Sequence, residues 1–128
     1  MEKTVYYHDT DCGGVVYYAN YLKYMEEART EFFAQKGAPV KGLADSGVLF
    51  VIARQEIDYK LPAFYADTLT VHTRLARLSN AKIEFEHEVT NQHGALVCVG
   101  KAVMVCVGKD IKPRPIPEDL RKAFVQAL

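Results

Sequence analysis

Residues 18–36 read YANYLKYMEEARTEFFAQK, and this stretch decides which fold the chain can adopt. Its apolar side chains recur three or four positions apart, which is the spacing of one helix face. Gly37 and Pro39 then supply a stop signal. The stretch therefore predicts one long amphipathic helix, which needs an apolar surface to lie on. The predicted apolar face consists of Tyr21, Tyr24, Met25, Ala28, Phe32 and Phe33.

Four extended runs after the helix provide that surface, at residues 48–60, 68–78, 82–91 and 95–107. The third run alternates between apolar and charged residues, as a half-buried antiparallel strand does. The fourth is apolar at both parities, which predicts a strand covered on both sides, by the helix and, as one candidate, by a second subunit. With a short strand at residues 3–8, the order predicts an α+β fold in which a single helix packs on an antiparallel sheet. A short helix is expected at residues 118–128.

Length, charge and cysteine content narrow the class of protein. The chain has 128 residues, so we expect residues 1–128 to form a single domain. Sixteen basic residues balance sixteen acidic ones, which argues against a broad surface for nucleic acid. Three cysteines without a C-x-x-C pair favour a reducing compartment over a disulfide framework. No apolar run could span a bilayer and no signal peptide is recognisable, so we expect a cytoplasmic protein without an integral membrane segment.

A segment rich in acidic residues, glycine and tyrosine leads into the helix. Residues 6–21 read YYHDTDCGGVVYYANY. Gly13 and Gly14 let the chain turn tightly and let a ligand approach the main chain. The helix start offers unpaired N–H groups and a positive dipole end, where an oxyanion could bind. With Asp11 a few residues earlier, the segment holds the minimum groups for hydrolysing an activated acyl group.

Two other interpretations fit parts of this segment. Asp and Gly are also typical of turns that carry no chemistry. A calcium loop matches at Asp9 and Asp11 only, because Asn20 stands where the bidentate Glu is needed and the third acidic ligand is missing. We therefore predict no calcium, and the four scattered histidines predict no other metal site. His87 lies on the apolar face of its strand and is expected to be an interior histidine with hydrogen-bond partners.

The segment resembles the signature of the hotdog-fold thioesterases, specifically the group around 4-hydroxybenzoyl-CoA thioesterase and the YbgC-like acyl-CoA thioesterases. Four stretches match that family in order, over nearly the whole chain. They are residues 9–17, DTDCGGVVY, residues 20–31, NYLKYMEEARTE, residues 57–63, IDYKLPA, and residues 65–67, YAD. The resemblance implies a hotdog fold, in which a five-stranded antiparallel sheet wraps one long helix and the chain assembles as a homodimer or homotetramer.

The resemblance also implies the catalytic residues. The family's catalytic carboxylate falls on Asp11, and its preceding strand tyrosine falls on Tyr7. Many YbgC-like members have a histidine where this chain has Tyr18, whereas the 4-hydroxybenzoyl-CoA branch has a tyrosine there. This difference argues against a mechanism that needs an imidazole at that position. The backbone N–H near Tyr18, at the helix start, is then the group that polarises the thioester.

The phosphates of CoA call for basic residues along its path. Lys82, with Ser79 and Asn80 in the turn before it, is the first candidate by its position in the family. A solvated lysine at a strand edge is an equally good interpretation. Arg77 and Arg54 are weaker candidates.

The function that the resemblance implies is hydrolysis of acyl-CoA thioesters, with acyl carrier protein as a further candidate partner. No metal or organic cofactor is expected, since a thiolate is a good leaving group. Asp11 would either activate a water or attack the carbonyl directly, and the sequence leaves both routes open. Two other functions stay open: a non-catalytic acyl-CoA-binding protein, and a hydratase of the same fold that would use a paired His and acid. The tyrosine at position 18 points toward aromatic acyl groups, but the sequence does not identify the acyl chain.

Overall fold

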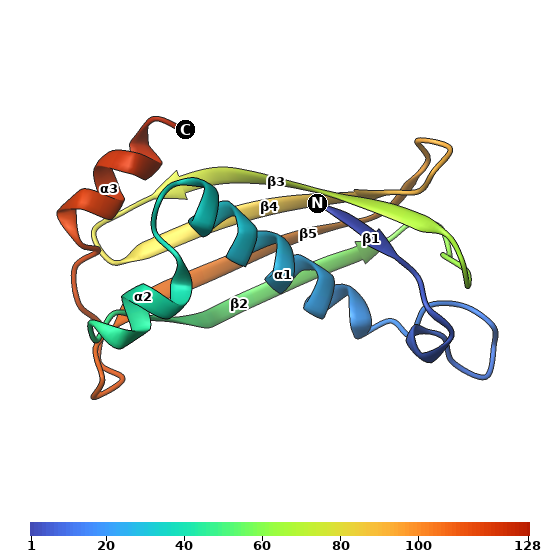
Figure 1. The fold of residues 1–128 in the computed structure, drawn as a ribbon, viewed down its shortest axis with the longest axis horizontal. Coiled ribbons are helices and arrows are strands. Elements are labelled where there is room, and N and C mark those ends of the chain that lie inside the picture. The colour runs from blue at the N-terminus through green and yellow to red at the C-terminus, as the bar shows by residue number, and fades with distance from the viewer.

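The computed structural model describes all 128 residues and shows one sheet with a long helix lying on one face (Figure 1). The sheet has five antiparallel strands in the order β1-β3-β4-β5-β2. The predicted α+β arrangement of one long helix on a five-stranded antiparallel sheet is confirmed. The strands are β1 (Glu2–Thr4), β2 (Leu49–Tyr59), β3 (Thr68–Leu78), β4 (Lys82–Thr90) and β5 (Leu96–Val107).

The long helix α1 covers Asn20–Gln35 and buries the face that its sequence predicts. Of the six predicted apolar residues, five are buried and Phe32 is half-buried. Arg29 is also buried, which the apolar pattern alone does not indicate. The helix begins two residues later than predicted, and Gly37 follows its end with a positive φ of 78°.

The inner face of the sheet and α1 enclose two groups of buried apolar side chains. One group surrounds the first half of α1 and includes Tyr24 and Met25. The other surrounds Phe33 near the end of α1, where Phe85 and Phe124 pack against it. The long helix therefore connects both parts of the core, and Tyr21 of its first turn is buried in the first group.

Two local predictions about the ends of the chain need correction. The predicted strand at residues 3–8 is shorter, because the backbone leaves the sheet after β1 and forms a 3₁₀ turn, η1 (Tyr7–Asp9). The cause is Asp9, whose buried carboxylate accepts the N–H of Tyr6 at 2.8 Å and pulls the chain into that turn. The C-terminal helix α3 (Glu118–Val125) is confirmed in a shorter form.

A second short helix, α2 (Val40–Asp45), was not predicted. Its six residues include a glycine and bury no side chain, so it leaves no periodic pattern in the sequence. It follows α1 and lies at the same end of the molecule as α3 (Figure 1).

The outer face of the sheet is open in the single chain. On β5, Val99, Val103 and Val105 are half-buried on that side. Val99 and Val103 lie between charged residues of both neighbouring strands, and Val105 lies between Val51 and Lys82. The expected cover by a second subunit therefore stays a prediction. None of the helices is both long and apolar enough to cross a membrane.

Candidate active site

A tight loop between η1 and α1 presents Asp11 at one end of the molecule (Figure 1). Thr10 pairs with Val16 across the loop, and the N–H of Asp11 donates to the C=O of Val15 at 2.9 Å. The N–H of Gly14 donates to the C=O of Asp11 at 3.0 Å, with a φ of 80° at Gly14. That backbone conformation favours glycine. The loop therefore holds Asp11 in a defined place although the residue is exposed.

Only one of the two carboxylate oxygens of Asp11 accepts a hydrogen bond from the chain. Its Oδ1 accepts the N–H of Gly13 at 2.8 Å, and its Oδ2 accepts no hydrogen bond from the chain. A Cβ at position 13 would lie 3.1 Å from Asp11 Oδ1, so a glycine there leaves room for the carboxylate. Asp11 can therefore offer one oxygen to a water molecule or a substrate while the other holds it in place.

Asp9 supports this loop from inside, a role that its sequence did not reveal. It is only 6% exposed. Its carboxylate accepts the N–H of Tyr6, and its C=O accepts both the N–H of Tyr17 at 2.9 Å and Asn20 Nδ2 at 2.8 Å. The spacing Asp-x-Asp was the available signal. One carboxylate of the pair turns inward and fixes the loop, while the other turns outward.

The start of α1 presents backbone donors that no group of the chain accepts. The N–H groups of Tyr18, Ala19 and Tyr21 make no intramolecular hydrogen bond, whereas that of Asn20 donates to the C=O of Tyr17 at 2.9 Å. The C=O of Tyr18 accepts a hydrogen bond from Tyr59 Oη at 2.9 Å. Free N–H groups at the positive end of a helix favour a bound anion or oxyanion.

Beside these donors lies an open groove of about 320 Å³ with a mainly apolar lining. Tyr21 and Tyr59 meet there in a T-shaped contact with ring centroids 5.7 Å apart. The groove could take the apolar part of an acyl group next to the helix start. Its lining consists of Val15, Val16, Tyr18, Tyr21, Tyr59, Lys60, Leu61 and Pro62.

The loop and the helix start both raise the pKa of nearby tyrosines. The hydroxyl of Tyr18 raises the pKa of Tyr17 most, and the negative charge of Asp11 raises it further. Partial burial, followed by Cys98 and Tyr18, raises the pKa of Tyr59. Tyrosine hydroxyls are protonated at neutral pH even without such a shift, so both can act as donors.

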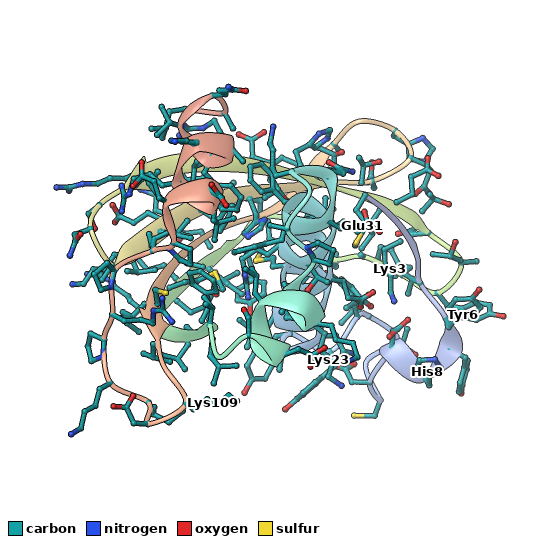
Figure 2. The ribbon with its side chains drawn as sticks, turned by 60° about the vertical axis from the view of Figure 1, so that its left-hand side comes forward. Lys3, Tyr6, His8, Lys23, Glu31 and Lys109 are labelled. Carbon is teal, nitrogen blue, oxygen red and sulfur yellow. The ribbon has the colours of Figure 1, made fainter.

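Tyr7 lies at the same end of the molecule but makes no hydrogen bond through its side chain. It belongs to η1, is 78% exposed and packs edge-on against Tyr65 with ring centroids 5.8 Å apart. Figure 2 shows the neighbouring side chains of Tyr6 and His8 projecting from the same turn. The structure thus gathers Tyr7, Asp11 and Tyr18 at one end, with no hydrogen bond joining any two of their side chains.

Lys82, Ser79 and Asn80 lie at the other end of the sheet, next to α3 (Figure 1). Ser79 Oγ accepts the N–H of Lys82 at 3.3 Å, and Arg121 donates to the C=O of Ser79 at 2.6 Å and of Asn80 at 3.0 Å. The ammonium of Lys82 forms no ion pair. One chain alone therefore does not bring these residues to Asp11.

The weaker basic candidates have partners of their own on the outer face of the sheet. Arg54 pairs with Glu56, and Arg77 lies 3.7 Å from Glu84. His87 is buried, as predicted, with Nδ1 3.1 Å from Thr73 Oγ1 and Nε2 3.4 Å from Arg29.

Comparison with known proteins places this geometry in a family. The model of the thioesterase-like superfamily matches residues 5–124. The acyl-CoA thioesterase YbgC of Haemophilus influenzae is 37% identical over 122 residues, which cover 94% of this chain and 89% of that protein. The acyl-CoA thioester hydrolase YbgC of Escherichia coli O6:H1 is 32% identical over 123 residues, which cover 95% and 92%.

A solved structure agrees with the sequence matches. The gentisyl-coenzyme A thioesterase BH1999 superposes with a TM-score of 0.90 at 31% identity, covering 97% of this chain and 98% of that one. The hotdog fold and the family that the sequence predicted are both confirmed. This chain belongs to the thioesterase-like superfamily.

Proposed function

We propose that this chain hydrolyses acyl-CoA thioesters to the free acid and CoA, with Asp11 as the attacking or water-activating carboxylate. The observation that carries the proposal is the presence, at one end of the molecule, of a carboxylate with one free oxygen, on Asp11, and of the free N–H groups of Tyr18 and Ala19 at the start of α1. The relatives described above are named as acyl-CoA thioesterases, which supports the same reaction here.

The proposed reaction uses only groups of this chain and water. The thioester C=O would accept hydrogen bonds from the N–H groups of Tyr18 and Ala19, which stabilise the negative charge that develops on that oxygen. Asp11 Oδ2 would take a proton from an attacking water, or would attack the carbonyl carbon itself to form an anhydride that water then opens. In both routes the CoA thiolate leaves and takes up a proton. Tyr7 and the hydroxyl of Tyr18 are proposed to contact the substrate at this site.

The wider setting of the enzyme is part of the same proposal. We place the complete site between two subunits of a homodimer, with a homotetramer as the larger assembly, because β2 is an open sheet edge beside the groove. The groove would be closed by the partner, and Lys82 of a neighbouring subunit would meet the CoA phosphates. A cytoplasmic location suits the three free cysteines. Acyl carrier protein is the second proposed carrier of the acyl group.

A panel of acyl-CoA thioesters tests the reaction. Wild-type protein is assayed for thiol release with short aliphatic, long aliphatic and aromatic acyl groups, and Asp11→Asn is assayed in parallel. We expect Asp11→Asn to lose at least about a hundredfold in kcat, the scale of general acid–base catalysis, while acyl-CoA binding survives. Tyr18→Phe is expected to show a smaller loss.

The outcomes separate the candidate functions. Binding without thiol release in the wild type would mean an acyl-CoA-binding protein of the same fold. Turnover that survives in Asp11→Asn would show that another group carries the reaction. Hydration of crotonyl-CoA without thiol release would mean a hydratase.

A further inference from the structure

The edge strand β2 reaches the proposed oxyanion-binding groups through the side chain of Tyr59. Tyr59 is the last residue of β2, and its Oη donates to the C=O of Tyr18 at 2.9 Å. That carbonyl accepts no hydrogen bond from any backbone N–H. Because the two residues are 41 positions apart, this contact joins the edge of the sheet to the start of α1.

The geometry of a peptide unit gives this contact a consequence for Ala19. A peptide unit is planar and rigid, so its C=O and its N–H point in opposite directions. The C=O of Tyr18 and the N–H of Ala19 belong to the same unit. A hydroxyl that fixes the C=O therefore also fixes the direction of the free N–H. Hydrogen bonds in a chain polarise one another, so the same contact makes that N–H a stronger donor.

The ring of Tyr59 is itself held in place. It packs edge-on against Tyr18 with ring centroids 6.4 Å apart, and against Tyr21 with centroids 5.7 Å apart. Its strand position is fixed by pairing with Cys98 of β5. These contacts hold the ring of Tyr59 although the residue is 48% exposed. A tyrosine hydroxyl is protonated at neutral pH, so it can donate to the C=O of Tyr18.

We propose that Tyr59 is a positioning residue, whose hydroxyl orients the peptide unit between Tyr18 and Ala19 so that the free N–H of Ala19 faces the thioester oxygen. This inference rests on the proposed function, because that function gives the N–H groups their role. Charge develops on the thioester oxygen in the transition state. A loss of orientation is therefore expected in kcat rather than in KM.

Tyr59→Phe tests the proposal because it keeps the ring and removes only the hydroxyl. We expect kcat for the best acyl-CoA of the panel to fall about tenfold, which corresponds to about 1.4 kcal/mol. KM is expected to stay within about twofold, as for a group that acts only in the transition state. A second measurement needs no turnover: the amide ¹⁵N resonance of Ala19 should shift when its peptide unit loses the hydrogen bond at C=O.

Tyr6→Phe is the matched control. Its hydroxyl is exposed and makes no hydrogen bond in the chain, so both kcat and the Ala19 resonance should keep their wild-type values. Unchanged kcat in Tyr59→Phe, alongside an active wild type and an inactive Asp11→Asn, would overturn this inference and leave the proposed function standing. A wild type without turnover on any acyl-CoA would overturn both. An Ala19 resonance that does not move would show that Tyr59 does not orient this peptide unit.

Discussion

Beneath the long helix, Nη1 of Arg29 lies 3.4 Å from Nε2 of His87, and the guanidinium forms no ion pair with any carboxylate. Arg29 is 5% exposed and His87 1% exposed. Burial, followed by the charge of Arg29, lowers the pKa of His87 to about 4. The imidazole is therefore neutral at physiological pH. It accepts a hydrogen bond from Arg29 through Nε2, and its Nδ1–H donates to Thr73 Oγ1 at 3.1 Å.

From this buried pair we predict that the free energy of unfolding decreases as the pH is lowered below about 6.5. The unfolded chain protonates His87 below a pKa of about 6.5, whereas the folded chain resists protonation down to about 4. The unfolded state thus binds more protons between these values, and stability is lost as the pH drops through that window. We expect the contribution of His87 at pH 4.5 to be about 2–3 kcal/mol lower than at pH 7.5. Urea unfolding at both pH values, at fixed protein concentration, measures it.

His87→Gln is the control for this window, because an amide can still accept from Arg29 but does not titrate. Its unfolding free energy should change less between pH 7.5 and 4.5 than that of the wild type, by about the amount given above. Equal pH dependence in the two proteins would show that His87 is not the group that titrates.

Substitution of Asp9 is expected to lower folding stability, whereas substitution of Asp11 is expected to lower kcat. Asp9→Ala removes the charged acceptor of the Tyr6 N–H, a partly buried hydrogen bond, which should cost about 1.5–3 kcal/mol of folding stability. Asp11→Ala removes an exposed side chain, so its stability should stay within about 0.5 kcal/mol of wild type. Thermal unfolding and kcat measured on both variants separate the roles. A stable Asp9→Ala, or an unstable Asp11→Ala, would contradict the assignment.

The same two residues show how far the sequence predicts this site. Helix periodicity located α1 and its buried face, and alternation located β4, because both patterns are local. The choice between Asp9 and Asp11 is not local. Which carboxylate turns inward depends on where the loop meets α1, and the resemblance rather than the spacing selected Asp11. Tyr59 lay within a recognised stretch, yet its contact with Tyr18 spans 41 positions and leaves no pattern.

Gly100 on β5 allows α1 to approach the sheet closely. A Cβ at this position would lie 2.6 Å from Met25 Sδ and 3.3 Å from the C=O of Glu56. Since Met25 is fully buried, Gly100→Ala should overpack the core and destabilise the fold by about 1–3 kcal/mol. Gly42→Ala in α2 meets no atom within 4 Å and should be stabilising by up to about 1 kcal/mol. The loss in the double variant Gly100→Ala with Met25→Ala should be smaller than the sum of the two single losses, because the smaller side chain at position 25 relieves the clash. Purely additive unfolding free energies in that cycle would show that the two side chains do not compete for space.

The open edge of β2 predicts how the chain assembles. β2 pairs only with β5, and its other edge presents unpaired backbone groups together with exposed Ile52 and Val51. Such an edge is a template for pairing with another strand, and a charged side chain on it opposes that pairing. Ile52→Lys should therefore give a monomer at micromolar concentration in sedimentation velocity. Because the proposed site is completed between subunits, loss of the dimer in Ile52→Lys should also lower kcat.

Glu2→Lys is the control on the other sheet edge, where β1 has only three residues. This variant should keep both the wild-type assembly and the wild-type kcat. An Ile52→Lys protein that remains a dimer would place the interface elsewhere, and a monomer with full kcat would show that one chain holds a complete site.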